Sequence, residues 1–197
     1  MITSLLSQRT SVRAYQDTPI PAAVLQDILE AGRLSPSGGN EQAWAFGVVT
    51  DRETIARIAE AAHAQRWIAA APLLIVLCTL PVSDDRGARD IQLDRYPEHA
   101  AGILSMDYEL YTRLNQEEHQ TKIAGTHMAL AALEHGVGSC WVSRFVVRQV
   151  AEILHLPPGV LPSEILVLGY PLEARSLRKK KSLDELVFYN EFSNRPA

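Results

Sequence analysis

The chain has 197 residues, of which 47% are hydrophobic and 21% charged, and its formal net charge is −4. This composition fits one globular domain with a sizeable core and excludes a disordered chain or a strongly basic nucleic-acid binder. It has two cysteines, Cys78 and Cys140, and lacks an apolar run long enough for a signal peptide or a membrane span. We therefore expect a cytoplasmic protein with no disulfide framework, no membrane contact and no nucleic-acid partner.

Helical and strand patterns alternate along the chain without an internal repeat or a linker, so we expect a single domain over residues 1–197. Thr50 and Glu53 have the spacing of a capping box. The apolar run at 72–80 indicates a strand buried on both faces, whereas 81–121 gives no clear pattern. Together the elements predict a layered α/β or α+β domain. In chain order we expect a helix over 19–33, a strand over 44–49, a helix over 50–63, a strand over 72–80, a helix over 122–136, a strand over 139–145, a helix over 146–156 and a strand over 164–170.

Metal and nucleophile chemistry find little support in the sequence. The pairs Glu60–His63 and Glu152–His155 have the Glu-x-x-His spacing of di-iron helix bundles. Such a site also needs further glutamates on an all-helical frame, which the strand patterns contradict, so we interpret all four as helix-surface residues and expect no metal. Cys140 could act as a nucleophile, but a small apolar residue within a strand is the favoured interpretation.

Two separate basic segments could bind an anion. In QRTSVRAY, residues 8–15, an extended backbone would project Arg9, Ser11 and Arg13 to one side, a set suited to a phosphate. The run RKKK at 178–181 taken alone is better explained as a solvated surface or a non-specific nucleic-acid patch.

The stretch SPSGGNEQAW, residues 35–44, combines glycines that permit close backbone approach with amides that donate and accept hydrogen bonds. A flat ring with alternating carbonyl and N–H groups, together with a phosphate, would satisfy both kinds of segment. A flavin mononucleotide fits that description.

At these residues the sequence resembles the nitroreductase family of FMN-dependent oxidoreductases. Four stretches match in the family's order: RTSVRAY, LSPSGGNEQAW, GVGSCWV, and LGYP followed by RKKKSLDELV. The resemblance implies an α+β fold, a three-layer α/β/α sandwich around a mixed, mainly antiparallel sheet. It also implies a homodimer with the flavin at the subunit interface, where the tail LVFYNEF would wrap the partner or pack within its own subunit.

The resemblance also implies a role for individual residues. Arg13 would lie near flavin N1, where a cation stabilises the negative charge of the reduced ring. The Ser143 N–H would lie near N5, and Asn40 would bond the pyrimidine edge. No catalytic acid or base is expected, because the flavin carries the chemistry. The full cofactor-binding set is Arg9, Thr10, Ser11, Arg13, Pro36, Ser37, Gly38, Asn40, Trp141, Val142, Ser143, Arg178 and Lys180, with Pro36, Ser37 and Gly38 reaching the ring from the partner subunit.

This chain departs from the family pattern at several places. Thr10 stands where a second basic residue is common, Ala43 replaces a proline, and Ser143 replaces a frequent glycine. Residues 81–121 match nothing in the pattern. We interpret them as a variable insert that could cover the substrate cleft and choose the substrate, or as a helix that packs on the core. The candidate substrate residues are Trp67, Met106, Tyr108 and Tyr111.

The implied activity is ping-pong hydride transfer. NADH or NADPH would reduce flavin N5, and a small oxidised acceptor such as a nitroaromatic or a quinone would then take the electrons. One alternative is a flavin-binding carrier or redox sensor without turnover. A second alternative reads the basic run at 178–181 as a nucleic-acid contact, which the net negative charge opposes.

Overall fold

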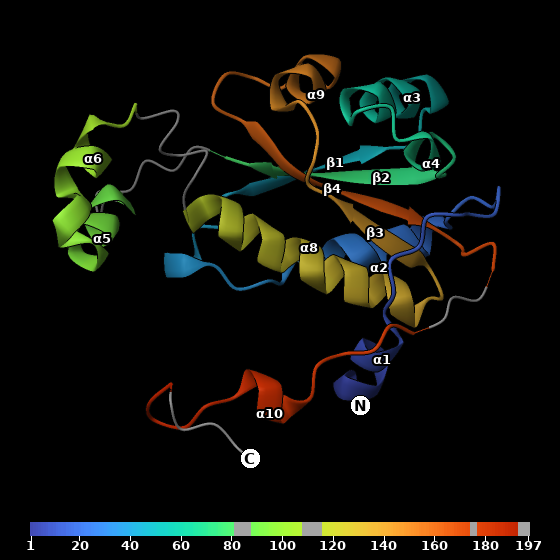
Figure 1. The fold of residues 1–197 in the computed structure, drawn as a ribbon. Coiled ribbons are helices and arrows are strands. Elements are labelled where there is room, and N and C mark those ends of the chain that lie inside the picture. The colour runs from blue at the N-terminus through green and yellow to red at the C-terminus, as the bar shows by residue number, and fades with distance from the viewer. Residues whose placement is uncertain (81–87, 108–115, 174–176, 193–197) are drawn as a thin grey trace.

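The structure, a computed structural model, describes residues 1–80, 88–107, 116–173 and 177–192. Its helices and strands alternate along most of the chain (Figure 1). The strands are β1 (Trp44–Val49), β2 (Leu73–Thr79), β3 (Gly138–Val142) and β4 (Leu161–Gly169). The described helices are α1 (Ile2–Gln8), α2 (Ala22–Arg33), α3 (Arg52–Ala61), α4 (Arg66–Ala69), α5 (Ala88–Arg95), α6 (Ala100–Ser105), α8 (Gln116–Glu134), α9 (Val147–Ile153) and α10 (Leu183–Leu186), with 3₁₀ turns η1 (Gly38–Asn40) and η2 (Pro97–His99).

The four described strands form one sheet in the order β1-β2-β4-β3, and each neighbouring pair is antiparallel. Parallel pairing among the described residues is limited to an isolated bridge between Ser11 and Ser139. The prediction of a mainly antiparallel sheet is confirmed. Its parallel component is this bridge, which attaches the N-terminal segment to the edge of β3.

Helices cover both faces of the sheet (Figure 1), which gives the predicted three-layer sandwich. Strand β2 shows why, because all seven of its residues are buried. Leu74, Val76 and Cys78 face the core beneath α3, α4 and α9. Leu73, Ile75 and Leu77 face the core against α2 and α8. Successive side chains of a strand point to opposite faces, so an unbroken apolar run fits a strand between two helical layers.

Several predicted boundaries are wrong by a few residues for identifiable reasons. Helix α3 is capped by Asp51, whose carboxylate accepts from the Thr54 N–H at 2.8 Å, so Thr50 is not its cap. Strand β4 starts at Leu161, before the apolar run, and a register irregularity sits where Pro162 faces Cys78. A proline lacks the N–H that a regular ladder requires, which hides the start of this strand from the sequence pattern.

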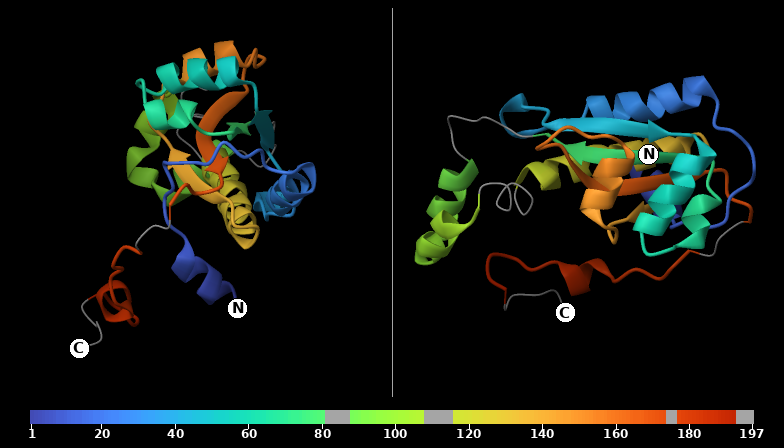
Figure 2. Two further views of the ribbon diagram at one scale, coloured as in Figure 1. Left: turned by 90° about the vertical axis from the view of Figure 1, so that its right-hand side faces the viewer. Right: turned by 90° about the horizontal axis from the view of Figure 1, so that it is seen from above.

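The insert and the tail depart from the body of the sandwich. Helices α5 and α6 stand beyond one end of the sheet, and the tail, residues 177–192, runs along the α8 side past α1 (Figures 1 and 2). The aromatic side chains of the tail, Phe188, Tyr189 and Phe192, are exposed. Packing of the tail within its own subunit was one of two predictions, and for these described residues it is wrong.

Candidate functional site

The first basic segment is held extended against the sheet. The Val12 N–H donates to the Ser139 carbonyl at 3.0 Å, and the Leu172 N–H donates to the Ala14 carbonyl at 3.0 Å. Val12 is 4% exposed and packs in the core beneath α3 and α9. Because the backbone is extended there, the neighbours of Val12 point away from that core, as the alternation predicts.

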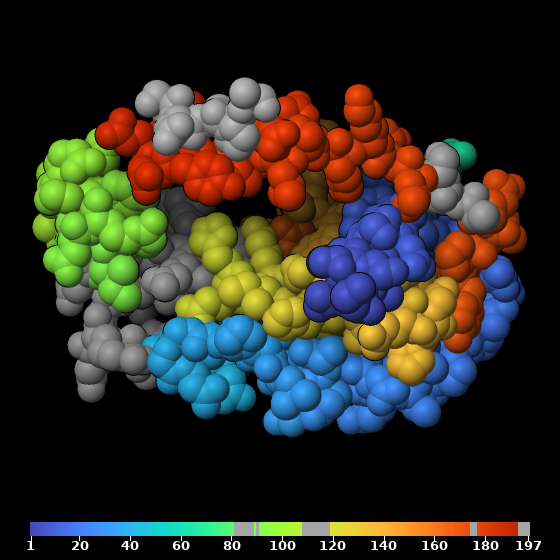
Figure 3. All heavy atoms as spheres, turned by 90° about the horizontal axis from the view of Figure 1, so that it is seen from below, coloured from blue at the N-terminus to red at the C-terminus, as the bar shows by residue number. Residues whose placement is uncertain are grey.

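Those neighbours line a groove of about 1320 Å³ between α1 and the tail. In Figure 3 the tail arches over the face formed by α1 and α8, with a hollow beneath it. Four cationic side chains and one carboxylate, that of Glu173, line this groove. The two basic segments, distant in sequence, therefore meet at one surface. The lining residues are Thr3, Leu6, Ser7, Arg9, Thr10, Ser11, Arg13, Ala14, Glu173, Leu177, Arg178, Lys180 and Leu183.

The Arg13 guanidinium lies over the ring of Trp67, 5.6 Å from the ring centroid. Trp67 belongs to the short helix α4 and packs against the core cluster that contains Val12. The structure thus brings a predicted substrate residue, Trp67, next to a predicted cofactor residue, Arg13. The sequence around Arg13 and the sequence around Trp67 contain no pattern that predicts this contact.

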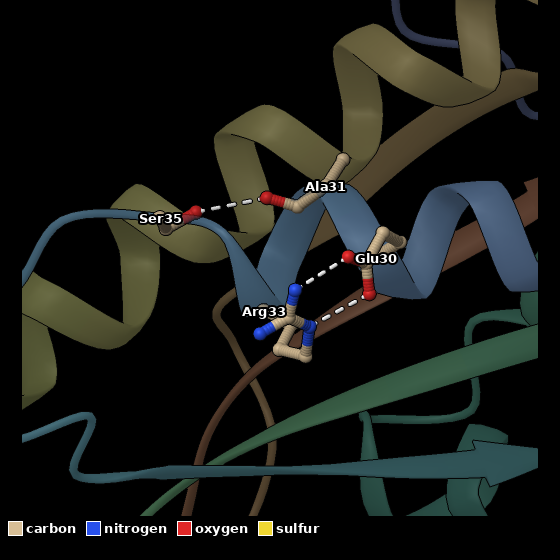
Figure 4. A network of polar contacts seen from close by, with 4 residues as sticks. All are labelled: Glu30, Ala31, Arg33 and Ser35. Carbon is tan, nitrogen blue, oxygen red and sulfur yellow. Dashed lines mark hydrogen bonds and ion pairs between the residues drawn. The ribbon is translucent and has the colours of Figure 1, made fainter.

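The amide-rich stretch lies elsewhere, at the end of α2 and beside the first half of α8. Ser35, at the end of α2, donates its hydroxyl to the Ala31 carbonyl at 3.1 Å, and the neighbouring Arg33 forms an ion pair with Glu30 (Figure 4). The Ser35 hydroxyl also lies 2.7 Å from His127 Nδ1 on α8. These contacts fix the exit of α2 and direct the chain into η1.

Much of the backbone of this stretch is already hydrogen-bonded within the chain. The Gly38 N–H donates to Gln120 Oε1 at 2.6 Å, and the Gln42 N–H donates to Ser37 Oγ at 2.9 Å. Asn40 and Gln42 adopt positive φ, 59° and 51°, a conformation that is uncommon for residues other than glycine. The side chains of this turn, more than its N–H groups, are left to meet a ligand. Pro36, Ser37, Gly38 and Asn40 are not among the residues that line the groove.

The third predicted segment lies on β3 and its exit. The Trp141 ring packs in the α2–α8 core and approaches Gly125 so closely that a Cβ there would lie 2.6 Å from the ring. Val142 is buried and Ser143 is exposed. These three residues are also absent from the groove lining, so any contact of theirs with a cofactor would be made at a different surface.

Of the remaining predicted substrate residues, Met106 ends α6 and is exposed, and its carbonyl accepts from Arg89 Nη2 at 3.1 Å. Tyr108 and Tyr111 lie outside the described residues. Among the described elements, α5, η2 and α6 contact one another, and they supply no residue to the lining of the groove. Figure 2 shows α5 and α6 beyond the end of the sheet.

Comparison with known proteins identifies the family. The model of the Nitroreductase family matches residues 6–170, which include the N-terminal basic segment, the amide-rich stretch and all four strands. The chain belongs to the nitroreductase family.

Its relatives include a protein of Archaeoglobus fulgidus named putative NADH dehydrogenase/NAD(P)H nitroreductase, 28% identical over 87% of this chain and 86% of the relative. An FMN reductase [NAD(P)H] of Bacillus subtilis is 31% identical over 94% of this chain and 72% of that protein. Among solved structures, an NADPH:FMN oxidoreductase of Vibrio harveyi in complex with NAD⁺ superposes with a TM-score of 0.76 at 22% identity, over 97% of this chain and 77% of that one.

The glutamates of the two Glu-x-x-His pairs lie on adjacent helices, α3 and α9, whereas His63 and His155 follow the ends of those helices with positive φ, so their prediction as helical residues is wrong. Glu60 and Glu152 line the same surface pocket between α3 and α9. All four side chains are exposed, as their interpretation as surface residues predicts. Within the described part of the chain, no three histidine, cysteine or carboxylate side chains come together as a metal site would require.

Both cysteines of this family member are buried and neither forms a disulfide, which confirms their interpretation as core residues. Burial raises the pKa of the Cys78 thiol to about 11. A thiol of this kind is a poor nucleophile at neutral pH.

As for membranes, none of the described helices combines the length and the apolar character needed to cross one.

Sequence reasoning missed a polar cluster at the end of the sheet nearest the insert. Glu164 is 4% exposed, and its Oε1 lies 3.3 Å from Lys122 Nζ while Oε2 has no described hydrogen-bond partner. The Thr79 hydroxyl lies 3.1 Å from that of Thr121 and 2.5 Å from that of Ser163. The sequence did contain a signal for Glu164, because a charged residue at the start of an apolar, buried strand is unusual. It contained no signal for Gln120 and Thr121, because both lie in residues 81–121, which have no clear pattern.

Proposed function

We propose that this chain is an FMN-dependent NAD(P)H oxidoreductase of the nitroreductase type. The observation that carries the proposal is the groove where Arg9 and Arg13 meet Arg178 and Lys180. Four cations against the single carboxylate of Glu173 suit a dianionic phosphate monoester. The relatives named FMN reductase and NAD(P)H nitroreductase support the same cofactor and the same reductants.

In this proposal six residues of the groove have defined tasks. Arg9, Arg178 and Lys180 bind the phosphate, and the hydroxyls of Thr10 and Ser11 add hydrogen bonds to phosphate or ribityl oxygens. Arg13 places its positive charge beside the pyrimidine edge of the ring. When bound, FMN would supply hydride transfer between the nicotinamide and the acceptor, and the protein would supply binding, orientation and charge.

We further propose that the complete site requires two copies of this chain. The turn that contains Ser37 and Asn40 lies beside the first half of α8, away from the groove lining (Figure 1). One chain therefore offers a phosphate site and an amide turn on different parts of its surface. A homodimer that brings the turn of one copy to the groove of the other would enclose the flavin at the interface.

The acceptor would be a small oxidised molecule such as a nitroaromatic or a quinone. The nicotinamide and the acceptor would use the same cleft in turn, so we expect ping-pong kinetics. The described part of the insert supplies no residue to the groove of its own chain. The exposed side chain of Met106, next to α6, is the described candidate for contact with the acceptor.

A visible absorption spectrum of the purified protein with added FMN, followed by anaerobic NADH or NADPH, tests the function. We expect bound flavin whose absorption bleaches on addition of the reductant. Bands that persist would favour the carrier or sensor alternative, and failure to bind FMN would contradict the proposal.

Arg13→Ala tests the assignment of the groove. It should weaken FMN binding about tenfold or more, because it removes a charge-assisted contact, and it should make the flavin potential more negative. Arg33→Ala is the matched control, since Arg33 is paired with Glu30 on α2 and lies outside the groove. Unchanged FMN affinity and potential in Arg13→Ala would remove Arg13 from the site.

A further inference from the structure

The contact between Arg13 and Trp67 restricts the side chain of a residue that lines the groove. An exposed arginine samples many rotamers, and a binding site must restrict them before its charge can be aimed. In this chain the guanidinium of Arg13 rests on the Trp67 ring, 5.6 Å from its centroid. Guanidinium groups stack well on indole rings because the ring face is electron-rich.

The ring itself is fixed by contacts on its own side. Trp67 Nε1 donates to Gln65 Oε1 at 3.2 Å, and Gln65 Nε2 donates to the Ala62 carbonyl at 2.8 Å. The Gln65 amide thus connects the indole to the end of α3. The ring also packs against the core cluster that holds Val12, the residue next to Arg13. The stacking platform and the backbone of the basic segment therefore share one rigid support.

In the part of the chain that the structure describes, the partner of this guanidinium is an aromatic ring and not a carboxylate. Among the described residues, no ion pair involves Arg13, whereas Arg33 is paired with Glu30 and Arg148 with Glu152. An acidic partner would neutralise the charge that the groove offers. An aromatic partner holds the side chain and leaves its charge available to an anionic ligand.

We infer that Trp67 is a positioning residue that stacks on Arg13 and presents its guanidinium to the ligand in the groove. This inference rests on the proposed function, because FMN is the ligand it concerns. It replaces the prediction that Trp67 is a substrate residue, since the Arg13 guanidinium already lies over the indole ring and the ring packs against the core. The substrate preference would then depend on other residues.

The test measures FMN affinity by flavin fluorescence, and the flavin midpoint potential, in a double-mutant cycle. In the wild-type background, Trp67→Leu should raise the FMN dissociation constant about two- to fivefold and shift the potential to more negative values. In the Arg13→Ala background, Trp67→Leu should have no further effect, because its partner is gone. Trp67→Phe should restore most of the affinity, since a phenyl ring still offers a face.

The control is Arg66→Ala, which removes an exposed cation from the same helix without touching the groove lining. We expect its FMN affinity and potential to equal those of the wild type. Should Trp67→Leu fail to fold, Gln65→Ala keeps the ring and removes its fixed hydrogen bond, and it should lower affinity in the same direction.

Two results would overturn the inference while leaving the proposed function intact. One is a wild type that binds FMN while Trp67→Leu and Arg13→Ala have additive effects on its affinity. The other is a Trp67→Leu variant with unchanged FMN affinity and a raised KM for the acceptor, which would return Trp67 to the acceptor site. A wild type that binds no FMN would overturn the proposed function and this inference together.

Discussion

At the scale of single residues, Gly138 is the point at which β3 receives the N-terminal basic segment. A Cβ at Gly138 would lie 2.5 Å from Val12 Cγ2 and 3.1 Å from Pro171 Cγ. Val12 is packed in the core and its N–H is bound to Ser139, so it has little freedom to move aside. Glycine therefore suits this position, because the side chains of Val12 and Pro171 occupy the space that a Cβ would need.

We predict that Gly138→Ala destabilises the protein by about 1–3 kcal/mol, as overpacking of a close contact does. It should also weaken FMN binding, because the displaced segment carries Arg9 to Arg13. Thermal unfolding and a fluorescence titration with FMN check the two effects.

Gly102→Ala is the control for this prediction. Gly102 lies within α6, where an added Cβ meets nothing within 4 Å, and alanine favours a helix. We expect unchanged FMN binding and unchanged or slightly higher stability. A Gly138→Ala variant as stable as Gly102→Ala would show that Val12 is not confined as described.

Some contacts of the candidate site follow from sequence and others do not. The alternation of Arg9, Ser11 and Arg13 predicted a common direction, because an extended backbone has a period of two residues. The stack of Arg13 on Trp67 and the bond from Gly38 to Gln120 join segments that no periodicity relates. Such pairs depend on how the elements pack, so the sequence pattern contains no signal for them.

At the scale of elements, the start of α3 gives a prediction in which pH has a role. The Asp51 carboxylate accepts from both the backbone N–H and the hydroxyl of Thr54, and these bonds lower its pKa. Because the pKa of Asp51 is lower in the folded protein than in the unfolded chain, the ionised carboxylate stabilises the folded state at any pH above the unfolded-state pKa. This contribution to the free energy of unfolding is lost as the pH falls through the folded-state pKa.

We therefore predict that Asp51→Ala lowers the melting temperature at pH 7 and that the difference from the wild type shrinks at acidic pH, below the ordinary aspartate pKa of 3.8. Thermal melts across pH 3–7 measure it. Thr50→Ala is the control, because the capping-box pattern would make Thr50 the cap whereas the structure assigns that role to Asp51. A larger effect from Thr50→Ala than from Asp51→Ala would contradict the structure.

The elements that the sequence predicted best are those whose burial dictates their composition. Strand β1 has the predicted bounds, and β2 lies within its predicted run, because both pack within the sandwich. Helix α8 begins at Gln116, six residues before the prediction, since its first turns are polar and stand at the end of the sheet. Helix α5 was not predicted. Helix α6 falls in the insert, for which a helix packed on the core was one of two interpretations, but neither helix supplies a residue to the two core clusters.

At the scale of the whole molecule, apolar side chains remain uncovered along the face that holds the groove. Ile2 and Leu6 on α1 are exposed, as are Leu183 and Leu186 on α10. The aromatic residues at the end of the tail add to this surface, and Phe188 and Phe192 contact each other at 5.4 Å. Exposed apolar surface of this extent on neighbouring elements is typical of an interface between subunits.

We predict that the double variant Leu183→Asp/Leu186→Asp raises the dimer dissociation constant by about a hundredfold or more, because each charge would be buried without a partner. Light scattering coupled to size exclusion measures the mass across a concentration series, and FMN affinity should fall with the dimer fraction. Val146→Asp is the control, since Val146 is also exposed but caps α9 on the opposite helical layer, at a position where aspartate is favoured. A double variant that stays dimeric would remove α10 from the interface. A wild type that is monomeric yet binds FMN fully would place the whole flavin site within one chain, and the turn at Ser37–Asn40 would then have no role in it.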